Sequence, residues 1–468
     1  NMSANKSEFR LEHDLIGEKE IPANAYYGIQ TLRAKDNFFI TGVRLSQYPT
    51  LIIALAQVKK AAALTNYELD GISEHVKEAI CQACDEIIDG EFHNQFIVDP
   101  IQGGAGTSTN MNINEVVANR ALEIMGYQKG DYTHCHPNNH VNMSQSTNDA
   151  YPTAFRIALY EKLHLLEDSI KILKKSFLHK SIEFEHVIKM GRTQLQDAVP
   201  MTLGQEFKTY YTMMNDDLKV LRDARNLVRE MNLGGTAIGT GINAHPRYKQ
   251  IVKEHLQDIT GRPFKTADDL VEATQNTGAF VQISGVLKRI AVKVSKICND
   301  LRLLSSGPRT GFNEINLPAV QPGSSIMPGK VNPVIPEVVN QVAFQVIGSD
   351  VTISMASEGG QLQLNVFEPV IVYNLFQSIS MLCRAFETLA YKCVDGITAN
   401  EDRCRELVMN SIGLITALSP VIGYANSTAV AKEALESGKS VYDIVLEKEL
   451  LTKEDLDEYL KPENMIRK

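Results

Sequence analysis

Residues 321–333 combine reactive side chains with a backbone that can form neither a regular helix nor a regular strand. The segment holds three prolines and two glycines, which interrupt both kinds of element. It carries two serine hydroxyls, Ser324 and Ser325, followed by the ammonium of Lys330 and the carboxamide of Asn332. A helix can begin directly after it, with an asparagine cap or a proline in the first turn. A glycine-hinged loop that leads into a helix N-terminus suits the binding of a carboxylate and the holding of a reactive hydroxyl.

Three further stretches, residues 106–112, 144–149 and 191–197, are rich in short side chains that donate hydrogen bonds without carrying charge. Taken singly, such a cluster is typical of a helix cap or a turn. Taken together, they offer what a small dicarboxylate requires, which is donors around four oxygen atoms. Neutral donors with a single lysine would bind such a substrate less tightly than several fixed cations would, so the product could still be released.

Residues 323–332 resemble the signature of the aspartase/fumarase superfamily, and the three donor-rich stretches resemble its other signatures, in the same order along the chain. Members of this superfamily eliminate a group from their substrate and release fumarate. The resemblance implies an all-α fold of three domains with a central bundle of long helices. It also implies a homotetramer with a twenty-helix core, active sites shared between subunits, a small dicarboxylate substrate, and no cofactor or metal ion. The alternative for residues 321–333 alone is a Pro/Gly linker between two helices.

The resemblance also assigns roles to individual side chains. One group would hold the carboxylate that is remote from the proton to be removed: Thr107, Ser146, Thr147 and Ser325. A second group would hold the carboxylate next to that proton: Thr193, Lys330 and Asn332. Two amides would face the leaving amino group, with Thr107 as a candidate to be shared with them: Asn148 and Gln194.

The reaction we expect is the loss of ammonia from L-aspartate to give fumarate. Removal of the carbon-bound proton leaves a doubly charged enediolate, which Lys330 and Asn332 would stabilise. By resemblance Ser324 is the base, acting as an oxyanion. One lysine at about 4 Å supplies roughly 4 kcal/mol, which lowers the pKa of a hydroxyl by only about three. Backbone N–H groups of the loop must therefore contribute, and closure of the loop must remove water.

Gln194 stands where many members of the superfamily, fumarases included, carry histidine. A fumarase expels hydroxide as water and is thought to use that histidine, paired with a carboxylate, for proton transfer. Glutamine cannot titrate, whereas an ammonium group departs as neutral ammonia without help from an acid. Gln194 therefore favours an amine lyase over a hydratase. Glu337 is at the position of the histidine's partner. For this residue a functional role and stabilisation of a helix start both stay open.

Other readings of the chain stay open. The flanks 334–340 and 360–365 resemble aspartases more than fumarases, yet a class II fumarase or another fumarate-releasing lyase would use the same scaffold. A catalytically silent helical scaffold, as in the lens crystallins of the superfamily, is a third possibility. The histidines of residues 134–140 resemble a metal cluster, although a structural role is favoured because Pro137 interrupts their spacing. Residues 234–241 are glycine-dense without the lysine of a phosphate loop, and we interpret them as a tight connection near the mouth of the site.

The composition excludes several classes of partner. The chain of 468 residues is 44% hydrophobic and 22% charged, with a net charge of −9 and no long basic run, which argues against nucleic acid and acidic membranes. Its seven cysteines are scattered, and Cys81 and Cys84 are interpreted as reduced thiols on a helix. There is neither a long apolar run nor a signal-peptide pattern, so we expect a cytoplasmic protein.

Long helices must position these groups. We expect three domains over residues 1–145, 146–398 and 399–468. Shorter helices are predicted over 48–67, 73–89, 112–125, 400–410, 425–437 and 441–446. Long ones are predicted over 338–354 and 370–394, with a solvated charged tail over 453–458. Two hydrophobic stripes repeat in steps of three and four residues, which requires the helices that carry them to bundle. Their members are Leu159, Leu163, Leu166, Ile170, Leu173 and Phe177, and Ile283, Leu287, Ile290, Val294, Ile297, Leu301 and Leu304.

Overall fold

The structure, a computed structural model, describes residues 8–324, 326–327 and 329–466. This part of the chain is almost entirely helical, which confirms the all-α prediction. Its α-helices are α1 (Ile29–Asn37), α2 (Pro49–Glu68), α3 (Glu74–Ile88), α4 (Thr107–Ile124), α5 (Thr147–Glu183), α6 (Leu203–Arg225), α7 (Tyr248–Thr260), α8 (Leu270–Gln275), α9 (Gly278–Leu304), α10 (Val334–Glu358), α11 (Glu368–Lys392), α12 (Glu401–Met409), α13 (Leu414–Ile422), α14 (Tyr424–Ser437), α15 (Val441–Glu447), α16 (Lys453–Tyr459) and α17 (Pro462–Met465).

Short strands form four two-stranded sheets between the described helices. Three pairs are antiparallel, and the pair β5–β6 is parallel. The strands are β1 (Phe9–His13) with β2 (Glu18–Pro22), β3 (Ile188–Thr193) with β4 (Gln196–Thr202), β5 (Glu230–Met231) with β6 (Lys265–Thr266), and β7 (Ile315–Asn316) with β8 (Thr398–Ala399).

The chain divides into two compact units, each built from three stretches of sequence. Unit 1 comprises the chain up to Leu166, Val220–Lys288 and Gln345–Ser380. Unit 2 comprises Glu167–Lys219, Arg289–Phe344 and the chain from Met381. The longest helices contribute residues to both units. The three-domain division over residues 1–145, 146–398 and 399–468 stays a prediction.

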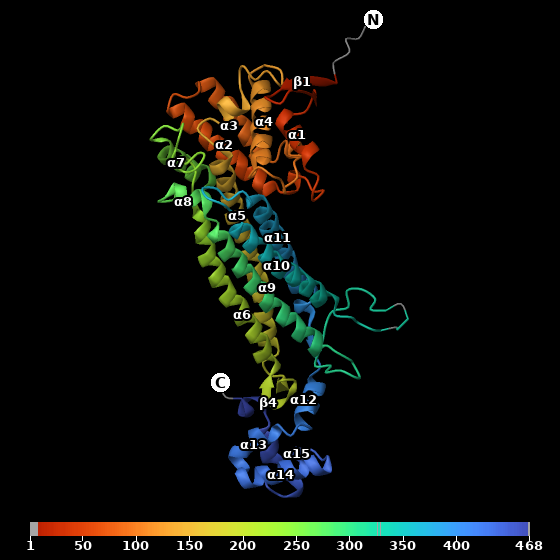
Figure 1. Ribbon diagram of the computed structural model, residues 1–468. Helices are drawn as coiled ribbons and strands as arrows, with labels where there is room; N and C mark the ends of the chain where they lie inside the picture. Colours follow the sequence, from red (N-terminus) through yellow and green to blue (C-terminus); the bar gives the residue numbers. More distant parts are fainter. Residues whose placement is uncertain (1–7, 325, 328, 467–468) are drawn as a thin grey trace. The chain divides into compact units, whose positions relative to one another are not determined.

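In unit 1, α2 and α4 both pack against α3, and α1 packs against α4 (Figure 1). The start of α3 follows from its sequence, because the hydroxyl of Ser73 accepts a hydrogen bond from the backbone N–H of Val76. Helix α2 is rich in alanine and aliphatic side chains that are buried along most of its length. One lysine, Lys59, is buried among them.

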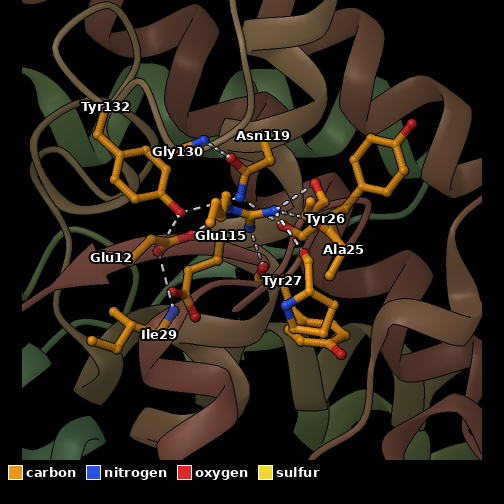
Figure 2. A network of polar contacts seen from close by, with 12 residues as sticks. Glu12, Ala25, Tyr26, Tyr27, Ile29, Glu115, Asn119, Gly130 and Tyr132 are labelled. Carbon is orange, nitrogen blue, oxygen red and sulfur yellow. Dashed lines mark hydrogen bonds and ion pairs between the residues drawn. The ribbon is translucent and has the colours of Figure 1, made fainter. Parts of the chain in front are cut away.

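Figure 2 shows a polar network around Glu12 and Glu115 in unit 1. Glu115, on α4, accepts hydrogen bonds from the backbone N–H and the hydroxyl of Thr31. Glu12, on β1, accepts from the backbone N–H of Ile29 at 3.2 Å and from the hydroxyl of Tyr132 at 2.9 Å. Two carboxylates therefore satisfy N–H groups in the first turn of α1, at the positive end of that helix.

The two predicted hydrophobic stripes are buried, which confirms that these helices bundle. Every member of the stripe over 159–177 is 0% exposed, and the members of the stripe over 283–304 are at most 6% exposed. In unit 1, the ring of Phe155 on α5 lies 4.6 Å from that of Phe280 on α9, measured between centroids. In unit 2, Asp217 on α6 forms ion pairs with two basic side chains of α9.

The predicted helices are found, with one substantial correction. Helix α4 begins at Thr107, five residues before the predicted start near Asn112, so the preceding loop is shorter than expected. The reason is that the polar residues there fill a helical turn, with Thr109 and Asn110 buried. No range was predicted for α1, α6, α7, α8, α13 or α17. The charged tail over 453–458 forms α16, whose Leu456 is buried while most of its acidic side chains are exposed.

The cysteines are free thiols, Cys81 and Cys84 included, in agreement with the prediction. Among the described helices, none combines the length and the apolar character that crossing a membrane would require.

Candidate active site

The N-terminus of α4 places Thr107 at the surface of unit 1. Gly106, directly before it, has a positive φ of 95°, and a Cβ there would lie 2.7 Å from the ring of Tyr151, so only glycine fits. The hydroxyl of Thr107 donates a hydrogen bond to the carbonyl of Gly104 at 2.7 Å. Thr107 is therefore an exposed side chain at the positive end of an 18-residue helix, which favours an anion.

The N-terminus of α5 lies beside that of α4. The hydroxyl of Thr147 accepts a hydrogen bond at 3.1 Å from the side-chain amide of Asn110, which is in the first turn of α4. The hydroxyl of Ser146 accepts one at 3.1 Å from the backbone N–H of Asn148. Unit 1 thus brings four predicted site residues into one cluster, which we call the unit 1 cluster: Thr107, Ser146, Thr147 and Asn148.

Residues 234–241 form hydrogen bonds that support the unit 1 cluster. Two backbone N–H groups of this segment donate hydrogen bonds to the buried carboxylate of Asp149, each at 3.0 Å. The side chain of Asn148 donates to the carbonyl of Ala237 at 2.8 Å. Burial raises the pKa of Asp149 to about 6, although its hydrogen bonds to backbone N–H groups oppose the rise. The glycine-dense segment is therefore a tight connection beside the predicted site residues.

In unit 2, the turn between β3 and β4 presents Thr193 and Gln194 to solvent. Thr193 pairs with Gln196, so Gln194 and Leu195 are the two central residues of a two-residue turn. Their φ values of 56° and 60° are those of a primed hairpin turn, in which asparagine and glycine are the usual residues. Holding such side chains in the left-handed region costs about 1 kcal/mol each or more, a strain that tends to occur at functional sites.

Ionic and hydrogen-bonded contacts within unit 2 anchor this hairpin. The guanidinium of Arg192 donates two hydrogen bonds, of 3.1 and 3.2 Å, to the carboxylate of Glu314, which is 0% exposed. The ammonium of Lys189 lies 3.3 Å from the same carboxylate. On the other strand, Asp197 accepts a hydrogen bond of 2.7 Å from the hydroxyl of Ser411. Two hydrogen bonds from one guanidinium to one carboxylate are strong and directional, so they help to fix the position of Thr193, the next residue.

The loop over 321–333 holds the hydroxyl of Ser324 against backbone N–H groups. The Ser324 oxygen accepts hydrogen bonds from the N–H of Ile326 at 3.2 Å and of Met327 at 3.3 Å. Hydrogen bonds to the charged form lower the pKa of a group, so these two would favour an alkoxide. Ser325, a predicted carboxylate ligand, lies outside the described residues.

The same loop closes on itself at its base. The carboxamide of Asn332 donates a hydrogen bond of 2.6 Å to the carbonyl of Gly323. A Cβ at Gly323 would collide with the carbonyl of Lys330, so glycine permits this close approach. The side chain of Lys330 is exposed, and Glu337 lies in the first turn of α10. Ser324 and Asn332 are thereby kept near the N-terminus of that helix.

Two family profiles match the chain, one described as lyase over residues 17–348 and one described as fumarase C C-terminus over residues 414–467. The chain belongs to the aspartase/fumarase family of lyases. Three curated relatives of this lyase are named aspartate ammonia-lyase. That of Helicobacter pylori (strain ATCC 700392 / 26695) is 66% identical over 98% of both chains. That of Pseudomonas fluorescens is 61% identical over 100% of this chain and 98% of its own, and that of Escherichia coli (strain K12) is 54% identical over 98% and 96%.

Solved structures have the same fold. A fumarate lyase:delta crystallin from Brucella melitensis, bound to cobalt, superposes with a TM-score of 0.95 and is 56% identical. A class II fumarase from Schistosoma mansoni superposes with a TM-score of 0.90 and is 36% identical. Each comparison covers 97% of this lyase and 98% of the other chain.

The predicted site residues of this lyase divide between its two units. The unit 1 cluster is brought together by the N-termini of α4 and α5. The hairpin residues Thr193 and Gln194 and the loop residues Ser324, Lys330 and Asn332 belong to unit 2. That the two sets meet in one pocket stays a prediction.

Sequence reasoning missed residues that support the site, above all Lys59. This side chain is 0% exposed and donates hydrogen bonds to Asn110 and two further amides. A signal was present, because Lys59 is four residues from both Leu55 and Ala63, on the apolar face of α2. Glu314, which anchors Arg192, had no local signal.

Two of the histidines weighed for a metal site accept hydrogen bonds from backbone N–H groups. The Nδ1 atom of His136 accepts hydrogen bonds from the N–H groups of Asn138 and Asn139, at 3.0 and 3.2 Å. The Nδ1 atom of His140 accepts one from the N–H of His136 at 2.8 Å. His136 caps a single π-helical turn, Pro137–Val141, which contains His140. Within the described ranges, no group of three or more His, Cys, Asp or Glu side chains is arranged to hold a metal ion.

Proposed function

We infer that this lyase is an aspartate ammonia-lyase, which eliminates ammonia from L-aspartate and releases fumarate. The observation that carries the inference is the extent of the match, because relatives of that name are 54–66% identical over 98–100% of this chain. Gln194 at the tip of the β3–β4 hairpin agrees with it. A glutamine cannot supply a proton, and an ammonium group leaves without one.

We propose that Ser324 is the base that removes the proton. Its oxygen already accepts two backbone N–H groups, which would favour the ionised form once the loop excludes water. Lys330, Asn332 and Thr193 would hold the carboxylate beside the reacting carbon and stabilise the enediolate as its charge develops. Backbone donors and one ammonium together would stabilise the ionised hydroxyl more than a single lysine could.

We propose that Ser325 and three residues of the unit 1 cluster, namely Thr107, Ser146 and Thr147, bind the remote carboxylate. The support is that this cluster lies at two neighbouring helix N-termini, where the helix dipoles favour negative charge. Asn148, held by its bond to the carbonyl of Ala237, and Gln194 would face the leaving amino group. Glu337 would then serve mainly to stabilise the start of α10.

The assembly we propose is a homotetramer whose active sites are shared between subunits. Supporting it, α10 exposes large hydrophobic side chains, among them Phe344 at 62%, Val351 at 60% and Met355 at 68%. An exposed apolar row of this kind on a folded chain marks an interface. We also propose a cytoplasmic location, since free cysteines are typical of a reducing compartment.

A substrate panel tests the proposed function. The purified protein should produce the ultraviolet absorbance of fumarate from L-aspartate, and none or far less from L-malate or argininosuccinate. Turnover of malate instead would favour the class II fumarase reading, for which the match of residues 414–467 speaks. Turnover of argininosuccinate would identify another lyase of the same scaffold. An absence of turnover on all three would favour a silent scaffold.

The variant Ser324→Ala tests the base. It should reduce kcat by at least about a hundredfold, since a positioned base contributes about 10²–10⁴ in rate. Its elution on size exclusion and its helical circular dichroism should match those of the parent protein. A folded Ser324→Ala variant with near-normal kcat would remove Ser324 from the mechanism.

A further inference from the structure

Lys59 is a buried charged residue of unit 1 for which the proposed mechanism has no role. It lies in the middle of α2 and its side chain is 0% exposed. Its Nζ atom donates hydrogen bonds to the side-chain oxygens of Asn110 at 2.7 Å, Gln145 at 2.8 Å and Asn142 at 3.0 Å. The three hydrogens of an ammonium are thus matched by three neutral amide oxygens.

An ammonium dictates which way each of these amides faces. Because an ammonium only donates, it holds the amide oxygens toward itself and turns the amide NH2 groups away. The NH2 of Asn110 then donates to the hydroxyl of Thr147 at 3.1 Å. The NH2 of Gln145 donates to the carbonyls of Val141 and Met143, at 3.0 and 3.1 Å. The charge on Lys59 therefore sets the direction of hydrogen bonds at the start of α5.

The direction matters most at Thr147. A hydroxyl has one hydrogen to donate, and its oxygen can accept. Since the Thr147 oxygen accepts from Asn110, its hydrogen is directed elsewhere, and among the described residues no acceptor for it is recorded. The side chain is only partly buried. Thr147 is thereby left as a donor toward an incoming ligand, which is the polarity that an acceptor-only carboxylate requires.

We propose that Lys59 is a positioning residue for the substrate: through Asn110 it holds the Thr147 hydroxyl as a hydrogen-bond donor to the remote carboxylate. The inference rests on the proposed function, in which Thr147 binds that carboxylate. It goes beyond that function because Lys59 acts without touching the substrate.

The charge state of Lys59 makes the binding of a dicarboxylate depend on pH. Burial lowers the pKa of its ammonium to about 7, while the carboxylate of Asp149 on α5 acts in the opposite direction, as would the thiol of Cys84 on α3 if it were ionised. Burial raises the pKa of the Cys84 thiol well above its ordinary value, so that group stays neutral. A neutral amine has two hydrogens for three amide oxygens. As the pH rises through about 7, the orientation of Asn110 is less firmly held and the site should bind a dicarboxylate more weakly.

The test compares Lys59→Met with Lys60→Met in the full-length protein. Lys60 is the next residue of α2, but it is partly exposed and pairs with Asp85 at 2.7 Å, so it is a matched control. Each variant is assayed for kcat and KM with L-aspartate and for competitive inhibition by succinate, a four-carbon diacid without an amino group. Lys59→Met should raise the KM and the succinate Ki about tenfold, with kcat changed less, because one charge-assisted hydrogen bond is lost. Lys60→Met should leave all three unchanged.

A double-mutant cycle separates positioning from a merely structural role. Thr147→Val removes the hydroxyl through which Lys59 acts, and should raise the succinate Ki by a similar factor. Lys59→Met combined with Thr147→Val should then be no weaker than Thr147→Val alone, because the two changes remove the same interaction. Effects that multiply, or a Lys59→Met variant with normal KM, would overturn the proposal. A parent protein without turnover of L-aspartate would instead overturn the proposed function.

A second measurement does not depend on whether Lys59→Met folds. In the parent protein the succinate Ki should rise through one ionisation near pH 7, whereas both succinate carboxylates are ionised throughout that range. In Thr147→Val this ionisation should be absent from the Ki profile. The same ionisation in both proteins would show that Lys59 does not act through Thr147.

Discussion

At the scale of the residue, two buried ionisable side chains of unit 1 depend on partners that the local sequence does not reveal. Lys59 is 0% and Glu115 is 1% exposed. A buried charge is costly unless hydrogen bonds replace its water. The partners that do so come from distant segments, Gln145 for Lys59 and Thr31 for Glu115. No pattern within α2 or α4 predicts these partners.

The carboxyl of Glu115 makes a pH-dependent contribution to stability. Burial raises the pKa of Glu115 from 4.5 to about 7, with a smaller rise from the charge of Glu12, while hydrogen bonds from Thr31 and Gln30 act against it. The folded protein therefore holds this proton more tightly than the unfolded chain does. The stability that it provides is fully present below about pH 4.5 and is lost as the pH rises through about 7.

Glu115→Gln should accordingly destabilise the protein less at about pH 8 than at about pH 5. The neutral amide is a stand-in for the protonated carboxyl, so at the higher pH the variant avoids a buried charge that the parent carries. The measurement is the difference in Tm between parent and variant at the two pH values. For Glu78→Gln, at an exposed position of α3, the difference in Tm should not change with pH. A difference for Glu115→Gln that is larger at the higher pH would contradict the assignment.

At the scale of the element, the stripes that the sequence predicts carry the stability of the bundled helices. Leu173→Ala, in the stripe of α5, should lower the free energy of unfolding by about 2–5 kcal/mol, because it leaves a cavity in a packed core. Lys171→Ala, on the exposed face of the same helix, should change it by less than about 0.5 kcal/mol. Thermal or urea unfolding followed by circular dichroism measures both. Equal effects would mean that the stripe does not face the core.

Turns and helix starts were harder to predict than helices. The turn Gln194–Leu195 places two side chains at positive φ, although neither residue type favours that region. The early start of α4 at Thr107 depends on Gly106, whose lack of a Cβ lets Tyr151 pack against it. In both cases packing and hydrogen bonds to distant residues outweigh local preference.

At the scale of the whole molecule, the proposed homotetramer with shared active sites predicts that each site takes residues from different copies of the chain. Mixing two defective variants tests this: Ser324→Ala from unit 2, and the double change Ser146→Ala with Thr147→Val from unit 1. In a homotetramer with shared sites, an equal mixture refolded together should regain about a quarter of the parent's sites, since each site draws intact residues from two chains independently. The rate of fumarate formation measures the recovery.

Each variant refolded alone is the control and should stay at its own low rate. If every site were built from a single chain, each would carry one of the defects, and the mixture would recover nothing. Light scattering on the parent protein checks the proposed tetramer separately.

The sequence by itself determined the helical class, the two buried stripes, the Pro/Gly-rich loop that carries Ser324 and Lys330, and the membership of a lyase family. Those features depend on residue types at short, regular spacings. Such spacings can be recognised in the sequence without knowledge of the fold. The tertiary structure alone decided that Lys59 is buried with three amides, that Glu314 holds Arg192, and that Asn110 donates a hydrogen bond to the Thr147 hydroxyl. Burial and the direction of a hydrogen bond depend on partners that come close only when distant segments pack together.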